Sequence, residues 1–192
     1  MGLIKPARVR IPAIALFGSK TGRSLMAGQT DVNEESAGLT KAKMPVEIRP
    51  LQSADQADWR GLWTDYLEFY GTSVSEAVIA TTFARLIGTD PQDFSCLVAV
   101  YDGKLVGLTH YLFHRNNWKI ENTCYLQDLF VAKAARGTGA GRALIEGVYA
   151  ASRAANVQAV HWMTQEDNTT ARQLYDRIAQ KSEFVQYVKV TP

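Results

Sequence analysis

The chain has 192 residues, of which 46% are hydrophobic and 21% are charged. This length favours a single domain, and the composition excludes a collagen-like, coiled-coil or mostly disordered chain. Because no run of about 18 apolar residues occurs, we expect no membrane span. Two cysteines are too few for a disulfide framework or a four-thiolate zinc site, and the three histidines do not cluster, so the sequence predicts no metal site.

The formal net charge of +2 is distributed unevenly. Residues 1–43 contain seven Lys/Arg and three Asp/Glu, whereas residues 44–192 contain fourteen and sixteen. We interpret 1–43 as an extension outside the fold and 44–192 as one domain. The extension is either a disordered or non-native segment upstream of Met44 or an organelle transit peptide, since its early residues are basic without acids. We therefore expect a cytoplasmic protein, with an organelle as the alternative.

The body shows alternating strand and helix patterns. A strand is predicted at 46–51, and Ser53 and Gln56 fit a capping box that opens a helix. The remaining elements, in chain order, are a helix after Ser75, strands at 96–101 and 104–114 joined by the hairpin signal Asp102-Gly103, a strand at 123–131, a helix at 139–153, a strand at 157–164, a helix after Asn168 and a strand at 184–190. The order βααβββαβαβ predicts an α/β (α+β) fold with a mixed central sheet.

The most informative segment is the glycine-rich turn between the strand at 123–131 and the helix at 139–153. It reads Arg136, Gly137, Thr138, Gly139, Ala140, Gly141 and Arg142. Glycines let a ligand approach the backbone, and the unpaired N–H groups of a helix's first turn favour an anion. The spacing fits neither a dinucleotide fingerprint nor a Walker loop, because the third glycine of the first and the Lys-Ser/Thr of the second are absent. The turn therefore predicts a different pyrophosphate site.

The pattern Arg136-x-x-Gly139-x-Gly141 resembles the signature of the GNAT superfamily of N-acetyltransferases. The resemblance extends over roughly residues 46–190 and is closest to the diamine and spermidine/spermine acetyltransferases and to the yeast histone and polyamine acetyltransferases. It implies a GNAT fold whose fourth and fifth strands splay apart after Val131. It also implies acetyl-CoA as the co-substrate and a primary amine as the acceptor.

The resemblance assigns the coenzyme A site to the end of the fourth strand, the glycine turn and the start of the last helix. Backbone groups of Leu129 and Val131 would pair with the pantetheine arm, and the Leu129 N–H would face the thioester oxygen. The expected coenzyme-binding residues are Leu129, Phe130, Val131, Arg136, Gly137, Thr138, Gly139, Ala140, Gly141, Arg142 and Asn168.

The resemblance makes Tyr175 the general acid that protonates the leaving thiolate, and a core tyrosine is the alternative. The attacking amine must be neutral, and deprotonating a lysine-like amine at pH 7 costs about 4.6 kcal/mol, so a base helps. The polyamine enzymes have a glutamate where this chain has Gln127, which cannot take a proton. Asp128 is the second candidate catalytic residue, although neighbouring strand residues point to opposite faces. It would orient a cationic acceptor or relay a proton through water.

The acceptor is expected to contact Gln127, Asp128, Tyr66, Trp118 and Glu166. For Tyr66 the alternative is core packing, and for Glu166 it is a solvated loop. The mildly acidic body suits a small cationic amine (a polyamine, a diamine or an amino acid-like molecule) or a lysine side chain. Its basic residues form no stripe with aromatics, so we expect no nucleic acid partner. A catalytically idle acyl-CoA-binding domain is the rival interpretation. The oligomeric state stays open, with a homodimer among the options.

Overall fold

The computed structural model describes residues 45–190, so the predicted extension at 1–43 lies outside the described residues. The helices and strands are β1 (Glu47–Pro50), the 3-10 turn η1 (Ser53–Asp55), α1 (Gln56–Phe69), α2 (Glu76–Leu86), β2 (Ser95–Tyr101), β3 (Lys104–His114), β4 (Thr123–Val131), the 3-10 turn η2 (Lys133–Ala135), α3 (Ala140–Ala154), β5 (Val160–His161) and α4 (Thr169–Ile178). The predicted mixed α/β fold is confirmed. Within residues 45–190, no helix combines the length and hydropathy needed to cross a bilayer.

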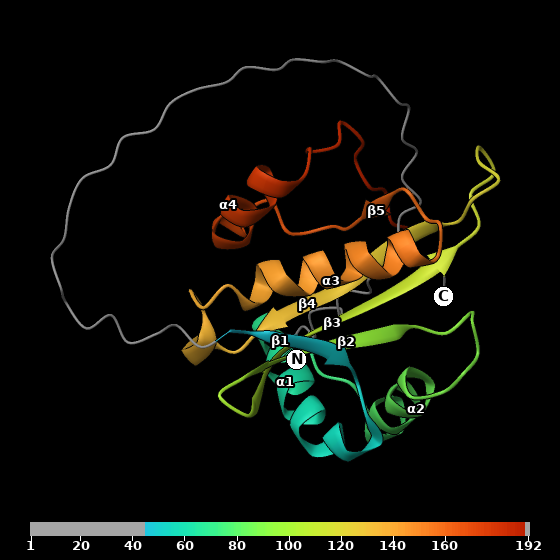
Figure 1. The fold of residues 1–192 in the computed structure, drawn as a ribbon. Helices are drawn as coiled ribbons and strands as arrows, with labels where there is room; N and C mark the ends of the chain where they lie inside the picture. The colour runs from blue at the N-terminus through green and yellow to red at the C-terminus, as the bar shows by residue number, and fades with distance from the viewer. Residues whose placement is uncertain (1–44, 191–192) are drawn as a thin grey trace, which may run out of the picture.

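The five strands form one sheet in the order β1-β2-β3-β4-β5. The first three pairings are antiparallel, and β4 pairs with β5 in parallel, because α3 connects these two strands. Figure 1 shows α1 and α2 on one side of the sheet and α3 on the other, with α4 beyond α3. The predicted Asp102-Gly103 hairpin is confirmed: both residues have positive φ, 51° and 71°, and join Tyr101 to Lys104.

Two hydrophobic clusters cover the two faces of the sheet. One packs the apolar stripe of α1 (Trp59, Leu62, Trp63 and Tyr66) with α2 against β2, β3 and Phe130. The other packs Leu144, Ile145 and Val148 of α3 against the opposite face. Because strand side chains alternate between faces, each buried strand contributes to both clusters, and the sheet becomes the middle of three layers.

The first helix begins differently from the sequence prediction. Asp55, rather than the predicted pair Ser53 and Gln56, anchors the entry, since its carboxylate accepts the Gln52 backbone N–H at 2.8 Å. The same carboxylate binds both terminal nitrogens of Arg49 at 2.7 and 2.9 Å. These hydrogen bonds from Arg49 are the main cause of a lowered pKa at Asp55. The ion pair therefore ties the end of β1 to the start of α1.

Strand β4 contains a bulge and then separates from β5. His110 faces Asp128 and Tyr111 faces Leu126, so Gln127 is an extra residue on β4. The parallel pairing with β5 covers only Cys124 and Tyr125. The fork predicted after Val131 therefore begins several residues earlier, at the bulge. The cause is local, because an extra residue bends the strand and interrupts its ladder.

The C-terminal part of the sheet is smaller than the sequence predicts. The strand expected at 157–164 is formed only at Val160–His161, and the strand expected at 184–190 is not formed. Five large apolar side chains of that last segment are exposed, namely Phe184, Val185, Tyr187, Val188 and Val190. Alternating apolar residues need a neighbouring strand edge, and a β5 of two residues presents almost none.

Candidate active site

The glycine-rich turn begins after η2 and ends at the first turn of α3. Gly137 and Gly139 have φ of 80° and 97°, and Gly139 is the N-cap of α3. A Cβ built on either glycine would meet nothing within 4 Å, so the space beside the turn is open. The first N–H groups of α3 thus border a free volume next to the positive end of a helix dipole. This geometry fits an anionic group such as a pyrophosphate.

Thr138 organises the turn from within. Its hydroxyl donates to the Ala135 carbonyl at 2.7 Å and accepts the Ala140 N–H at 3.4 Å. Thr138 is absent from the described residues that line the adjacent cavity. The side chain of Thr138, predicted to bind the coenzyme, therefore stabilises the turn.

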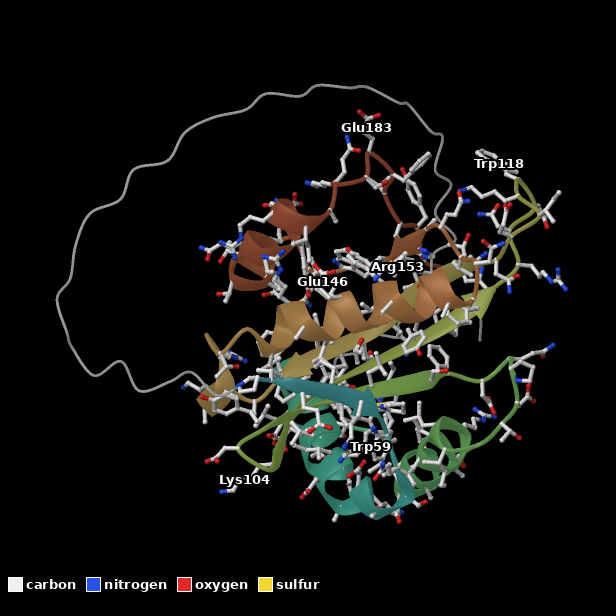
Figure 2. The ribbon with its side chains drawn as sticks, in the orientation of Figure 1. Trp59, Lys104, Trp118, Glu146, Arg153 and Glu183 are labelled. Atoms are coloured by element: carbon white, nitrogen blue, oxygen red, sulfur yellow. The ribbon has the colours of Figure 1, made fainter. Side chains whose placement is uncertain are left out.

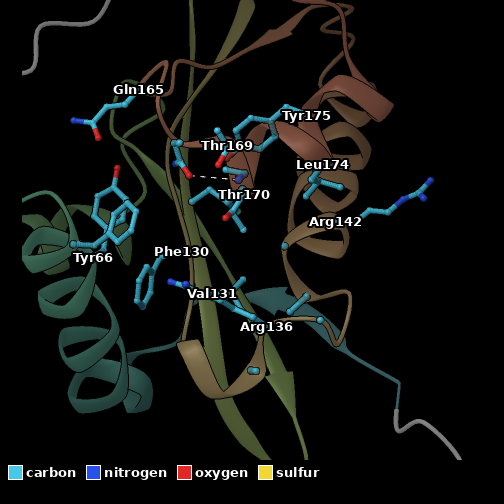
Figure 3. Close-up of a pocket in the computed structure, with 18 of the residues that line it drawn as sticks. Tyr66, Phe130, Val131, Arg136, Arg142, Gln165, Thr169, Thr170, Leu174 and Tyr175 are labelled. Atoms are coloured by element: carbon cyan, nitrogen blue, oxygen red, sulfur yellow. Dashed lines mark hydrogen bonds between the residues drawn. The ribbon is translucent and has the colours of Figure 1, made fainter.

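A cavity of about 740 Å³ extends from the glycine turn to the face of α1. Its walls come from the end of β4, the turn, the start of α3, the C-terminal half of α1 and one side of α4 along most of its length. The predicted residues in its lining are Tyr66, Leu129, Phe130, Val131, Arg136, Gly137, Gly139, Ala140, Gly141, Arg142, Asn168 and Tyr175. Figure 3 shows Tyr66, Gln165 and Tyr175 around one end of this cavity. Residues from four elements thus converge on one elongated site.

The hydrogen-bond ladder of β4 determines which backbone groups face the cavity. The Ala132 N–H bonds to the Val106 carbonyl at 2.8 Å, and the register with β3 continues through Phe130 and Leu108. Backbone groups along an antiparallel strand point alternately to one neighbour and the other. Phe130 therefore bonds toward β3, while the N–H and carbonyl groups of Leu129 and Val131 point to the β5 side, where the fork has opened.

Arg142 lines the cavity, but its charged group lies beside α3. The Arg142 guanidinium lies 3.7 Å from the Glu146 carboxylate, one helical turn further along α3. In Figure 3 its side chain points away from the cavity. Arg177 of α4, which the sequence patterns did not identify, also lines the cavity. The sequence predicts that Arg177 lies on the last helix, but it does not show that this helix folds over the site.

Tyr175 lies on α4 and faces the cavity. Burial raises its pKa to about 12, with a smaller contribution from Tyr70. Its ring packs edge-on against Trp162, with ring centroids 5.4 Å apart. Tyr175 also borders a second cavity, of about 880 Å³, between β5, α4 and the following segment. A tyrosine at the junction of two cavities that keeps its proton can serve as a general acid.

Asn168 holds the start of α4 in place. Its side-chain carbonyl accepts the Ala171 N–H at 3.4 Å, as predicted for a cap, and its amide donates to Thr164 at 3.1 Å. Asn168 and Gln165 both line the first cavity. The cap therefore fixes the wall of the site that carries Tyr175.

Asp128 is 5% exposed and lies behind the cavity lining. Its carboxylate accepts the Tyr66 hydroxyl at 2.7 Å and lies 3.0 Å from Nδ1 of His110. Gln127 also donates to it, at 3.4 Å. The expectation that Gln127 and Asp128 point to opposite faces is wrong here, because the bulge interrupts the alternation. Tyr66 lines the cavity and separates Asp128 from it.

The remaining predicted residues lie apart from the first cavity. Trp118 is 67% exposed on the loop between β3 and β4, and Figure 2 shows it at the tip of that loop. Glu166 borders the second cavity, where its carbonyl accepts from Arg172 at 2.6 Å. The residues that line the first cavity but were missed from the sequence include Phe69, Gln165, Thr169 and Thr170. Within residues 45–190, no three His, Cys, Asp or Glu side chains gather in a group that could hold a metal.

Comparisons with known proteins agree with this geometry. The chain is 33% identical over 156 residues to the D-amino-acid N-acetyltransferase HPA3 of Saccharomyces cerevisiae, covering 81% of this chain and 96% of that protein. A ribosomal-protein-alanine N-acetyltransferase from Brucella melitensis superimposes with a TM-score of 0.64 at 19% identity, over 77% of this chain and 99% of that one. The aminoglycoside N-acetyltransferase AAC(6')-Iy, solved in complex with CoA, gives 0.67 at 17% identity, over 79% and 99%.

These last two likenesses concern the fold. The acetyltransferase (GNAT) family matches residues 52–179, which span η1 to the end of α4. That range contains the forked strands, the glycine turn and Tyr175. The chain belongs to the GNAT family of acetyltransferases and is an acetyl-CoA-dependent acyltransferase.

Proposed function

We propose that this protein transfers the acetyl group of acetyl-CoA to the primary amine of a small acceptor. One observation carries the proposal: a single cavity is lined by the β4 edge, the glycine turn and Tyr175. The first two bind a long anionic ligand in an extended form, and the third supplies a proton at its reactive end. A relative that is 33% identical is named for acetylating D-amino acids, so an amino acid is the first acceptor to test.

The site residues have distinct roles in this proposal. The amides at Gly137–Gly141 and the guanidinium of Arg136 hold the pyrophosphate. Leu129 and Val131 pair with the pantetheine arm as a neighbouring strand would, and the Leu129 N–H donates to the thioester oxygen as it gains negative charge. Acetyl-CoA supplies a thioester whose carbonyl carbon is the electrophile.

Tyr175 completes the reaction by donating its proton to the departing thiolate. A thiolate has an ordinary pKa of about 8.5, well below the pKa of about 12 at Tyr175. The transfer is therefore unfavourable for a fully formed thiolate with an ordinary pKa. It requires the tyrosine to donate its proton while the carbon–sulfur bond is breaking. At that stage the amine nitrogen, now bonded to the acetyl group, releases a proton, and this proton restores the phenol. The Trp162 contact holds the phenol ring in position for that donation.

A thiol-release assay tests the function. The protein is incubated with acetyl-CoA and, separately, a D-amino acid, its L enantiomer, spermidine and a basic lysine-containing peptide. We expect amine-dependent release of free CoA with at least one small amine, above the rate without acceptor. Gln127 in place of a carboxylate favours the rival function, a domain that binds acyl-CoA without turnover. Tight CoA binding with no release for any amine would establish that rival.

A further inference from the structure

Four buried side chains form a continuous hydrogen-bonded row from α1 through β3 to β4 and back to α1. The indole N–H of Trp59 donates to Nε2 of His110 at 3.0 Å. Nδ1 of His110 lies 3.0 Å from Oδ2 of Asp128, and the Tyr66 hydroxyl donates to Oδ1 at 2.7 Å. None of the four residues is more than 5% exposed. A row of buried polar side chains that are hydrogen-bonded to one another, within a hydrophobic layer, indicates a role beyond packing.

The Trp59 contact determines where His110 carries its proton. An indole nitrogen is only a donor, so Nε2 of His110 must be an unprotonated acceptor. The proton of the neutral ring then sits on Nδ1 and is donated to Asp128. Adding a proton to Nε2 would set two N–H groups against each other at 3.0 Å. His110 is therefore held in one tautomer and cannot pass a proton onward through Nε2.

Asp128 receives hydrogen bonds from three directions. Tyr66 binds one oxygen, while His110 and Gln127 bind the other. A carboxylate that accepts at both oxygens is fixed in orientation, and its Oδ1 points at the Tyr66 hydroxyl. The cross-strand register places His110 directly opposite Asp128, and the bulge brings Gln127 to the same carboxylate.

Tyr66 is the member of the row that reaches the active-site cavity. Tyr66 lines that cavity together with Tyr175, whereas Trp59, His110 and Asp128 lie behind it. In Figure 3 the Tyr66 hydroxyl points toward Gln165 at the end of the cavity where Tyr175 also lies. A phenol whose proton is directed at a carboxylate presents its oxygen as an acceptor to whatever enters there.

We propose that Tyr66 and Asp128 form a relay that takes a proton from the acceptor amine, and that His110 and Trp59 are positioning residues for this relay. The proposal rests on the N-acetyltransferase function proposed above. It assigns the missing base to a pair that ends in a carboxylate, in place of the side chain at position 127.

The relay moves one proton through two hydrogen bonds. The acceptor enters as an ammonium with one N–H on the Tyr66 oxygen. That N–H breaks first: the proton joins the Tyr66 oxygen, the Tyr66 proton moves to Oδ1 of Asp128, and the lone pair left on the nitrogen then attacks the acetyl carbonyl carbon. This first transfer is uphill, and the attack consumes the neutral amine as it forms; the new bond then makes the remaining N–H groups more acidic. Asp128 later returns the proton to solvent through Tyr66. The second amine proton, released as the thiolate leaves, restores the proton that Tyr175 donates.

The pH dependence of the relay belongs to a coupled group. The titratable side chains that face Asp128 are Tyr66 from α1, His110 from β3 and the thiol of Cys96 from β2. Burial raises the pKa of Cys96, and the charge of Asp128 adds to the effect. Cys96 therefore stays a neutral thiol, and the acid limb of the rate profile belongs to Asp128 together with the side chains hydrogen-bonded to it.

Kinetics on matched variants test the relay. Tyr66→Phe and Asp128→Asn should lower kcat by about 10²- to 10⁴-fold at pH 7, the range for loss of general base catalysis, while CoA affinity stays within about threefold. In Asp128→Asn, log kcat/KM should rise with unit slope up to the pKa of the free amine, because only amine already neutral in solution reacts. Tyr101→Phe, the same change at the end of β2, should have no effect. Wild-type pH profiles and rates in both relay variants would overturn the relay while leaving the acetyltransferase function intact.

Nuclear magnetic resonance tests the positioning role independently of activity. Long-range ¹H–¹⁵N correlation spectra should show His110 with a protonated Nδ1 and an unprotonated Nε2 near pH 7, with the signals assigned from their loss in His110→Asn. An Nε2–H tautomer or a doubly protonated ring would refute the proposed lock. His110→Asn keeps a donor near the Nδ1 position and should retain at least tenfold more activity than His110→Leu. Equal rates in the two would remove His110 from the relay.

Discussion

Replacing Gly141 by alanine should stabilise the protein and leave its binding of CoA nearly unchanged. Gly141 is in the first turn of α3, and its φ is not positive. An added Cβ would lie 3.7 Å from Val131 and 3.8 Å from Leu174, which are ordinary contacts. Alanine in a helix is favoured over glycine by about 0.5–1 kcal/mol. For a domain of this size the melting temperature should rise by about 1–4 °C.

A methyl group at Gly139 instead enters the open space where the proposed pyrophosphate meets the backbone, because no other atom lies within 4 Å of it. Forcing a methyl into a filled contact costs about 1–3 kcal/mol. The dissociation constant for CoA should therefore increase about 5- to 150-fold. Gly141→Ala is the control for an added methyl group in the same turn, because its methyl packs against Val131 and Leu174.

Gly139→Ala should also alter the stability of the free protein. With φ of 97° and no neighbour within 4 Å of a Cβ, its cost is backbone strain of about 1–2 kcal/mol, so its melting temperature should fall. The assays are differential scanning calorimetry without ligand and titration calorimetry with CoA. A Gly139→Ala protein that binds CoA as tightly as the wild type would refute the assignment of the turn as the pyrophosphate site.

Two further predictions concern Tyr175 and Asp55. Tyr175→Phe should lower kcat by about 10²- to 10⁴-fold with CoA affinity unchanged. Because burial raises the pKa of Tyr175 to about 12, wild-type kcat should show no loss of the acid near pH 10, where an ordinary tyrosine is half ionised. Unchanged turnover in the variant would assign the acid to another group. The pair Arg49–Asp55 should stabilise the fold above the ordinary pKa of Asp55, since its folded pKa is lowered, and this stability should disappear as pH falls through the folded value. Asp55→Asn should therefore reduce the free energy of unfolding by about 2 kcal/mol at pH 7, with a smaller difference at pH 3, in urea titrations. Equal differences at both pH values would contradict the electrostatic origin.

The sequence predicted those features that depend on local chemistry. Glycines with positive φ at the turn, the Asp102-Gly103 hairpin and the Asn168 cap each follow from neighbours within a few residues. The residues of the glycine turn therefore lay on the cavity almost as a block, apart from Thr138.

The features that the sequence did not predict correctly depend on contacts between segments that are distant in the chain. The bulge at Gln127 is set by its register against β3, and a period-two pattern cannot reveal an extra residue. The segment 184–190 has the alternation of a strand, but alternation does not supply a partner. His110 has hydrogen bonds at both ring nitrogens within the sheet and its flanking helix. Its link to the cavity runs through Tyr66, 44 positions earlier in the chain, and no local pattern records that.

The fork between β4 and β5 also bears on aggregation. Beyond its short pairing with β5, strand β4 presents an open strand edge at Leu129, Phe130 and Val131. Strand edges on protein surfaces are usually guarded by lysine, proline or a covering loop, because they template pairing with other chains. The apolar stretch here contains neither residue. A ligand that occupies the fork at a hundred times its Kd stabilises the fold by about 2.7 kcal/mol and covers this edge. Binding of the co-substrate should therefore protect this strand edge from pairing with other chains.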